Sequence, residues 1–292
     1  MSNKDTPFKK NIRPVRCGNK MIDFSTPKIM GVLNLTPDSF YDGGKFQQEK
    51  SVVEQTFRML KEGADMIDLG AVSTRPGAEL IAEKEELNRI IWPLQLLVKE
   101  FPDTIFSIDT FRSNVAKECI KSGAYIINDI SGGNMDDKMF ETVAELKVPY
   151  ILMHMHGTPE NMQKSPISGN IIELIRQFFE EQIEKLHSFG VEDIILDPGF
   201  GFGKTLKCNY TMLRNLEKLR IDNLPILGGI SRKSMINKVI NVKPSEALNG
   251  TTVLNTIALQ NGANILRVHD VKEAREAIEI VRFSEELGEC GA

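Results

Sequence analysis

Short runs of apolar and β-branched residues alternate along the chain with longer segments of helical period. Most of these runs are apolar at nearly every position until the last one or two residues, which is typical of strands buried on both faces of a parallel sheet. The runs predict strands at 29–35, 66–71, 105–110, 125–130, 150–156, 193–198, 225–231 and 264–269.

The segments between these runs are predicted to be amphipathic helices. In 87–101 and 171–186, apolar residues recur every three or four positions and form a single stripe that can pack against a sheet. Further helices are expected at 50–62, 112–121, 136–146, 209–219, 245–260 and 271–287. This alternation favours an α/β fold, a closed (β/α)8 or TIM barrel, over the alternative of an open doubly wound sheet.

The barrel is expected to form a single domain over residues 29–292, because the length of 292 residues suits an α/β barrel of about 250 residues or more. Residues 1–28 fall outside the repeat. We expect them to be a short N-terminal extension and suggest a hairpin that caps the barrel floor. The sequence shows no linker and no low-complexity tract between domains.

Composition and charge argue against several classes of partner. The net charge is −4 and no long Lys/Arg run is present, so we expect no binding to nucleic acid or to an anionic membrane. The longest apolar runs have about five residues, far short of the about 20 needed to span a membrane. The four cysteines are scattered, which favours reduced thiols and a cytoplasmic protein.

Polar residues gather where the predicted strands end. In a barrel these ends all meet at the C-terminal face, which is where such enzymes build their active sites. The sequence therefore predicts a ring of donors and acceptors around one pocket. Its candidate members are Asn34, Asp109, Asn128, Asp197, Lys233, Ser234, Arg267 and His269.

Four members of this ring suit a planar, hydrogen-bonding heterocycle. Asp109 and Asp197 offer acceptors, Lys233 offers donors and Asn128 offers both. The alternative for the two aspartates is a structural role as helix caps or salt-bridge partners, and that alternative stays open from the sequence alone.

Other members suit an anionic substrate that carries phosphate. Arg267, His269 and Arg75 bring positive charge of the kind that binds phosphate oxygens. The side-chain oxygen of Asn34 is a fair ligand for Mg²⁺, which usually keeps several waters and shares phosphate oxygens. These residues predict a leaving group that contains phosphate.

Several residues near the strand ends also have structural explanations. We expect His154 and His156 to be hydrogen-bonded residues at the barrel mouth, and Phe200 to pack. Phe202 is expected to stack on a ring. The glycine-rich segment 199–204 lacks the spacing of a nucleotide-binding P-loop, so it does not predict one.

The chain resembles the dihydropteroate synthase family in eight stretches that occur in that family's order and spacing from residue 29 to about residue 272. They are MGVLNLTPDSFYDGG, STRPGA, SIDT, INDISGG, ILMHMHGTPENMQ, ILDPGFGFGK, ISRKSMI and ILRVHDV. The resemblance implies a TIM barrel, in agreement with the predicted strands. One departure is Ala71-Val72, where the family often has Gly-Glu.

The resemblance also implies roles for individual residues. Asn34 matches the magnesium site. Thr74 and Arg75 match the second loop at the pterin diphosphate, and Asp109, Asn128, Asp197 and Lys233 match the pterin-recognition set. Arg267 and His269 match the diphosphate clamp, with Val268 between them. Pro37, Phe40, Phe202 and Ser234 match positions that border the p-aminobenzoate site.

The reaction implied by the resemblance is that of a folate-biosynthesis transferase. It condenses 6-hydroxymethyl-7,8-dihydropterin diphosphate with p-aminobenzoate to give 7,8-dihydropteroate and diphosphate, with Mg²⁺ as cofactor. The resemblance further implies a sulfonamide target and a homodimer joined through its late helices. The residues expected to carry the catalysis are Asp109, Asp197, Lys233, Arg267 and His269.

Two other functions remain possible on this fold. A corrinoid-linked methyltetrahydrofolate methyltransferase would share the pterin-binding acids but would not need Arg267, His269 or the loop that follows Asn34. A non-catalytic pterin-binding paralogue would be expected to lose the loop motifs first, and both are present. Release of diphosphate from the substrates separates these alternatives from the synthase.

Overall fold

The computed structural model describes residues 11–35, 44–73 and 80–286. Its main sheet has eight parallel strands in the order β8-β7-β6-β5-β4-β3-β10-β9. The predicted TIM barrel is therefore confirmed. The strands are β3 (Lys28–Asn34), β4 (Met66–Gly70), β5 (Ile105–Asp109), β6 (Ile126–Asp129), β7 (Tyr150–Met153), β8 (Ile194–Asp197), β9 (Leu227–Gly228) and β10 (Ile265–Val268).

The barrel closes between β8 and β9, which are not paired in a regular ladder. A bridge joins Leu196 to Ile226, and the Leu196 amide donates to the Pro225 carbonyl at 2.9 Å. The strand predicted at 225–231 was too long, because β9 has only two residues. Pro225 has no amide proton to donate to a ladder, and Gly228 and Gly229 have no side chains to pack in a strand.

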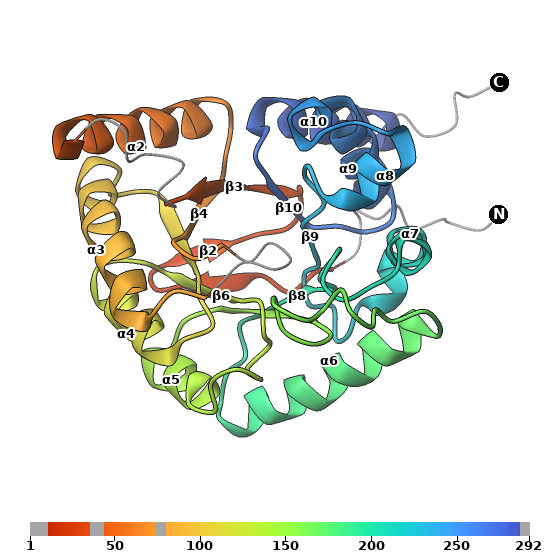
Figure 1. Ribbon diagram of the computed structural model, residues 1–292, viewed down its shortest axis with the longest axis horizontal. Helices are drawn as coiled ribbons and strands as arrows, with labels where there is room; N and C mark the ends of the chain where they lie inside the picture. Colours follow the sequence, from red (N-terminus) through yellow and green to blue (C-terminus); the bar gives the residue numbers. More distant parts are fainter. Residues whose placement is uncertain (1–10, 36–43, 74–79, 287–292) are drawn as a thin grey trace.

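Helices surround the strands as an outer ring (Figure 1). They are α2 (Gly44–Lys61), α3 (Glu83–Glu100), α4 (Ser113–Lys121), α5 (Met139–Leu146), α6 (Ile171–Ser188), α7 (Leu206–Arg214), α8 (Ser234–Ile240), α9 (Leu248–Gln260) and α10 (Val271–Glu286). The described residues also form the 3-10 helices η3 (Leu216–Leu219) and η4 (Pro244–Glu246).

The largest differences from the predicted helices are at 209–219 and at 234–240. The helix expected at 209–219 is divided into α7 and η3 at Asn215, whose side-chain amide donates to the Thr211 carbonyl at 2.8 Å. A side chain that bonds to the preceding turn competes with continued helix. Helix α8 was not predicted, because its seven residues are too few to show a clear period.

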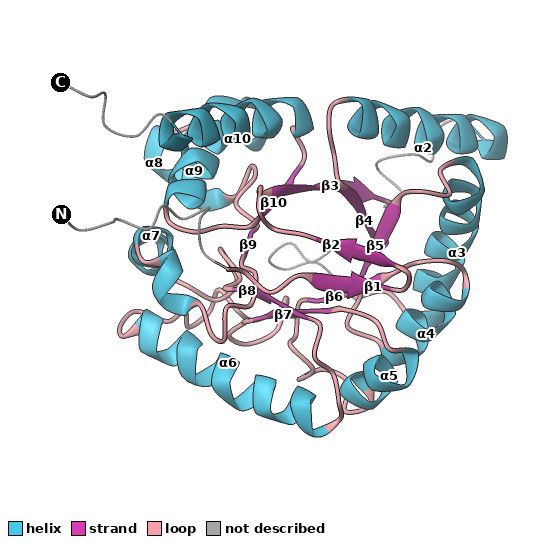
Figure 2. Cartoon of the chain, turned by 180° about the vertical axis from the view of Figure 1, so that it is seen from behind, coloured by secondary structure: helices cyan, strands magenta, loops and turns pink. Residues whose placement is uncertain are grey.

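An N-terminal hairpin covers one end of the barrel. Strands β1 (Val15–Cys17) and β2 (Lys20–Ile22) pair antiparallel around Gly18, whose φ of +62° suits a tight turn. The hairpin lies across the middle of the strand ring when the molecule is seen from behind (Figure 2). Its apolar residues pack on the first inward-facing side chains of the strands, including Met30, Met66, Ile126, Ile151, Ile195, Leu227 and Ile265.

Alternation along each strand separates the interior of the barrel from the layer beneath the helices. In β4, Ile67 and Leu69 pack in the large core between strands and helices, whereas Met66 packs with the hairpin side chains. Asp68 and Gly70 therefore face inward above Met66. The polar strand ends are directed to the opposite end from the hairpin.

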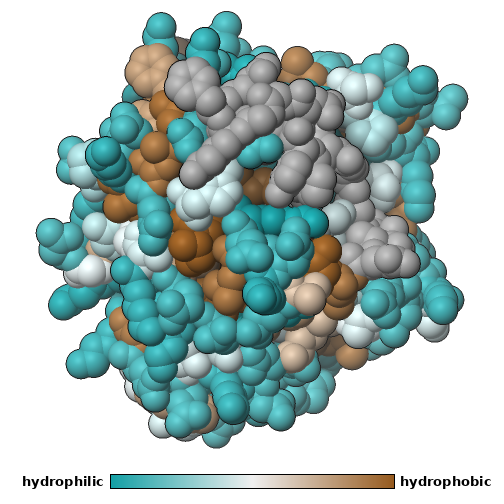
Figure 3. Space-filling view, turned by 60° about the vertical axis from the view of Figure 1, so that its left-hand side comes forward, coloured by the Kyte–Doolittle hydropathy of each residue, from teal (hydrophilic) through white to brown (hydrophobic). Residues whose placement is uncertain are grey.

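The outer surface is mainly hydrophilic on the face seen in Figure 3. Within the described residues, every helix is too short or too polar to cross a membrane.

Candidate active site

Arg267 is the centre of the polar cluster at the C-terminal end of the barrel. From β10, its guanidinium donates through Nη2 to Asp109 Oδ2 at 2.7 Å and through Nε to Asp68 Oδ2 at 2.7 Å. The Arg267 side chain is 20% exposed and the Asp68 side chain is fully buried. The predicted site residues Asp109 and Arg267 are thus in direct contact across the barrel.

Asp68 was not among the candidates predicted from the sequence. Its carboxylate also bonds to Asn128 and so brings Asn128 into the cluster. The amide nitrogen of Asn128, on β6, donates to Asp68 Oδ2 at 2.9 Å. The feature that could have identified Asp68 is that it is the single charged residue in the strand MIDLG, which is otherwise apolar. Charged residues are rarely buried without a partner, so such a position deserved to be a candidate.

The environment of Asp109 changes its ionisation. Burial raises the pKa of Asp109 to about 7, and the nearby charges of Asp68, Glu86 and Asp129 act in the same direction. The Arg267 guanidinium opposes this change by stabilising the carboxylate. Asp109 can therefore change its charge near neutral pH.

Asp197 and Lys233 both lie beside Gly229 at the barrel mouth. A methyl group built on Gly229 would lie 3.7 Å from Lys233 Nζ and 3.8 Å from Asp197 Oδ2. Because Gly229 has no side chain, the backbone here lies close to both an acceptor and a donor, the two kinds of group that fix the orientation of a flat polar ligand. Burial raises the pKa of Asp197 and lowers that of Lys233 to about 8, with Asp197 opposing the latter change.

The loop after β8 connects this pair to Phe202. Lys233 Nζ donates to the Phe200 carbonyl at 2.6 Å and lies 4.8 Å from the centre of the Phe202 ring. Phe202 also packs against an apolar group that contains Phe111, Ile130 and Met153. Phe202 thus presents a ring next to the donor–acceptor pair, whereas Phe200 is fully buried and packs in the core as expected.

The residues at the end of β10 differ in their exposure to solvent. His269 is exposed, and its Nδ1 lies 3.1 Å from the Ser231 hydroxyl. The Val268 side chain packs in the core beneath the helices, so a contribution of Val268 to ligand binding can come only from its main chain. Ser234 is exposed at the first position of α8.

His154 differs from the expectation of a hydrogen-bonded residue. It is buried, its Nδ1 has no partner among the described residues, and its ring packs edge-on against Phe178 at 5.0 Å. Burial lowers the pKa of His154 to about 2, so it is neutral. His156 is exposed.

The remaining predicted site residues fall in two loops. Pro37, Phe40, Thr74 and Arg75 lie outside the described residues. Asn34 and Ala71, which precede these loops, stand at the ends of β3 and β4 beside the mouth.

Asn34 was the predicted magnesium ligand. Its side chain is half-buried and makes no hydrogen bond to another described residue. The described residues contain no group of three or more His, Cys, Asp or Glu side chains that could hold a metal. This donor set fits only an ion that takes most of its ligands from water and substrate, as Mg²⁺ does.

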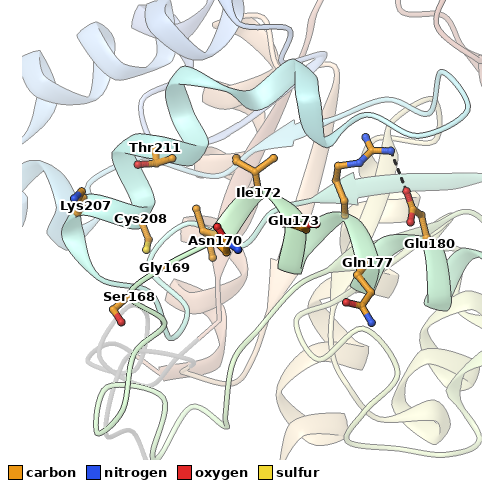
Figure 4. A pocket seen from close by; sticks show the side chains of 12 residues that line it. Ser168, Gly169, Asn170, Ile172, Glu173, Gln177, Glu180, Lys207, Cys208 and Thr211 are labelled. Atoms are coloured by element: carbon orange, nitrogen blue, oxygen red, sulfur yellow. Dashed lines mark hydrogen bonds and ion pairs between the residues drawn. The ribbon is translucent and has the colours of Figure 1, made fainter.

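A separate groove of about 880 Å³ lies outside the barrel, at the start of α6 and beside α7 (Figure 4). Its charged side chains include Arg176, which pairs with Glu180 at 2.9 Å. None of the site residues that the structure describes lines this groove.

Comparison with known proteins agrees with this geometry. Residues 30–269 match the family of pterin binding enzymes. The dihydropteroate synthase of Escherichia coli K12 is 43% identical over 262 residues, which cover 89% of this chain and 92% of the relative. The chain belongs to the dihydropteroate synthase family of pterin-binding enzymes.

Solved structures of dihydropteroate synthases share the fold. The Yersinia pestis enzyme, in complex with a sulfonamide drug, superposes with a TM-score of 0.88 at 40% identity and covers 94% of this chain and 100% of its own. The Burkholderia cenocepacia enzyme, complexed with 7,8-dihydropteroate, gives a TM-score of 0.85 at 34% identity, with 94% and 97% covered.

Proposed function

We propose that this chain is a transferase of folate biosynthesis that condenses 6-hydroxymethyl-7,8-dihydropterin diphosphate with p-aminobenzoate. The products are 7,8-dihydropteroate and diphosphate. The observation that carries the proposal is the convergence of Asp109, Asn128, Asp197, Lys233 and Arg267 on one barrel mouth in a member of this family.

The ring of the first substrate fits the polar part of the mouth. Asp197 offers two acceptor oxygens, one of which accepts from the Gly199 amide at 2.7 Å, and Lys233 offers a donor across Gly229. Asn128 presents an amide from β6. Adjacent donors and acceptors of this kind recognise a pterin edge by hydrogen bonds and leave its faces to apolar neighbours.

The charges suit a dissociative transfer. The bond between the exocyclic methylene and the diphosphate oxygen breaks first, and its electron pair leaves with the diphosphate. Arg267 and His269 stabilise the charge that builds on this leaving group, while Asp109 and Asp197 stabilise the delocalised pterin cation. The amine of p-aminobenzoate then attacks the methylene and loses a proton.

A bound Mg²⁺ would add positive charge next to the leaving diphosphate. Asn34 is the residue that would hold it, with diphosphate oxygens and water as the other ligands.

The p-aminobenzoate site is proposed to adjoin Phe202 and Ser234, with Pro37 and Phe40 on its border. The position of Phe202 supports this site, because its ring lies next to Lys233 at the edge of the proposed pterin pocket. Sulfonamides, which resemble p-aminobenzoate in shape, are expected to compete for the same place.

Turnover tests the proposed function directly. Purified protein is mixed with both substrates and Mg²⁺, and dihydropteroate and diphosphate are followed by chromatography. We expect both products in equal amounts, with inhibition by a sulfonamide that added p-aminobenzoate relieves. A corrinoid-linked methyltransferase would release no diphosphate, and a non-catalytic paralogue would bind the pterin without forming product; either result refutes the proposal.

We also propose a homodimer in the cytoplasm. Apolar side chains exposed on the late helices support the dimer, and they are Val239, Ile240, Val253, Ile280 and Phe283. The buried free thiols of Cys17, Cys119 and Cys208 support a reducing compartment.

A further inference from the structure

The buried carboxylate of Asp68 lies behind the residues that meet the substrate. One of its oxygens, Oδ2, accepts from both Arg267 Nε and Asn128 Nδ2. The other oxygen, Oδ1, is buried and has no hydrogen-bond partner among the described residues. Asp68 thus connects β4 to β6 and β10 at one point inside the barrel.

This arrangement is costly as a means of stabilising the fold. A buried carboxylate with an unpaired oxygen is less favourable than an apolar side chain of similar size, which would fill the interior without desolvating a charge. Met66 and Ile67, its neighbours on β4, show that the strand otherwise carries apolar residues. The carboxylate therefore has a purpose other than packing.

We propose that Asp68 is a positioning residue that holds Arg267 and Asn128 in the orientations in which they meet the pterin diphosphate. This inference rests on the proposed function. In the sheet register, Asp68 is paired with Ser107, whereas Asn34 and Asp109 are paired with Gly70, two residues closer to the barrel mouth. Asp68 itself therefore lies one layer below the ligand.

For Arg267, the effect of Asp68 is to fix the plane of the guanidinium. Asp68 holds Nε and Asp109 holds Nη2, so the group is attached at two points and cannot rotate about its long axis. Within the described residues, the third nitrogen, Nη1, makes no hydrogen bond, so neither carboxylate uses its donors. A diphosphate oxygen can therefore be met by a donor that is already in place.

For Asn128, Asp68 determines which end of the amide faces the ligand. An ionised carboxylate only accepts hydrogen bonds, so the amide nitrogen must be directed toward Asp68. The amide oxygen is then left to accept from a ring N–H. Without Asp68 the amide could rotate by half a turn and present donors instead.

The test compares Asp68→Asn and Asp68→Leu with a matched control, Asp65→Asn. Asp65 also pairs with an arginine, Arg275 at 2.6 Å, but at the other end of the same strand. Calorimetry measures the affinity for pterin diphosphate and for inorganic diphosphate, and thermal unfolding measures stability. We expect both Asp68 variants to bind roughly tenfold to a hundredfold more weakly, and Asp65→Asn to bind normally.

A double exchange, Asp68→Asn with Asn128→Asp, separates positioning from simple hydrogen bonding. It preserves a hydrogen bond between the two positions but reverses the amide and moves the negative charge. We expect it to leave the affinity low. Unchanged affinity in both Asp68 variants, an equal loss in Asp65→Asn, or recovery in the double exchange would overturn the proposal. If the asparagine variant does not fold, the leucine variant answers the same question.

The pH dependence of pterin binding is a further measurement, which a purely structural role of Asp68 would leave unchanged. The charges that act on Asp109 are those of Arg267, which contacts it at 2.7 Å, and of the more distant groups Asp68, Glu86, Asp129 and Lys233. Removing the charge of Asp68 removes one cause that raises the Asp109 pKa. The acid limb of pterin binding should therefore move to lower pH in Asp68→Asn and stay in place in Asp65→Asn; no movement counts against the proposal.

The two questions remain separable. Absence of turnover in the unaltered protein would refute the proposed function, whereas the role of Asp68 is decided by differences in binding between the variants and the control.

Discussion

Asp109 and Lys233 have pKa values within the range of an ordinary assay. Asp109 loses its negative charge as the pH falls through about 7, and Lys233 loses its positive charge as the pH rises through about 8. Both charges are needed if the carboxylate stabilises the pterin cation and the ammonium donates to the ring. The site is therefore complete only in a narrow interval.

We predict a bell-shaped dependence of kcat/KM on pH with limbs near 7 and 8. The measurement is the initial rate at low pterin diphosphate in buffers of constant ionic strength. The residual activity of Asp109→Asn should have no acid limb. A flat profile between pH 6 and pH 9 would show that these two groups do not control the reaction.

Asp197→Asn is predicted to weaken pterin binding. An amide offers one acceptor oxygen where the carboxylate offers two, so a buried donor of the ligand loses its partner. This loss costs about 1–3 kcal/mol, or roughly ten- to a hundredfold in affinity. Calorimetry with the pterin substrate measures it.

Asp193→Asn is the matched control, because Asp193 precedes the same strand and accepts from the Arg16 amide at the opposite end of the barrel. It should bind the pterin normally. Equal affinity of the Asp197 variant and the unaltered protein would remove Asp197 from the recognition set.

At the scale of elements, the loop between β8 and α7 is held by one buried lysine. Lys204 Nζ donates to the carbonyls of His154, Gly199 and Phe202 at 3.0, 2.8 and 2.9 Å. Gly199 has a φ of +66°, and a side chain there would collide with the His154 carbonyl. The loop therefore lies directly on the end of β7 and holds the backbone that carries Phe202.

Lys204→Met should loosen this loop. It keeps the length of the side chain but leaves three carbonyls without their donor, which lowers the free energy of unfolding by about 1–3 kcal/mol. Because Phe202 is on the loop, we expect KM for p-aminobenzoate to rise more than the dissociation constant of the pterin. Urea unfolding and steady-state kinetics measure the two effects.

The control is Lys207→Met, three positions along the chain, where the lysine is exposed. It should change neither quantity. A Lys204 variant with normal stability and a normal KM for p-aminobenzoate would show that the loop does not depend on this residue.

Exposed apolar side chains gather on the late helices of the protein. Ile280 and Phe283, on α10, are 70% and 62% exposed. Helices α8, α9 and α10 contact one another in sequence and lie together on one side of the barrel (Figure 1). Apolar patches of this kind mark interfaces between proteins.

We predict that the protein is a dimer by light scattering at micromolar concentration and that Ile280→Asp with Phe283→Asp makes it monomeric. Two charges in an apolar interface would be desolvated without partners. Phe189→Asp is the control, since Phe189 is 50% exposed at the end of α6, away from α10. A monomeric unaltered protein, or a dimer that survives the double substitution, would contradict this interface.

The amino-acid sequence alone predicts the architecture and the members of the site that stand at strand ends. Unbroken apolar runs and a period of about 3.6 residues are local properties, so the alternation of strands and helices could be predicted directly. In a parallel barrel every strand ends at the same face, and this alone brought Asp109, Asn128, Asp197 and Arg267 into one predicted pocket.

The pairing of these residues depends on how the chain folds in three dimensions. Arg267 bonds to Asp68 across 199 residues of chain, and that contact depends on barrel closure and strand register, for which no local pattern exists. The short length of β9 and the presence of helix α8 were likewise outside what periodicity can predict, because two and seven residues are too few to show a period. The sequence thus placed charges around a pocket, and the fold decided which of them hold the others in position.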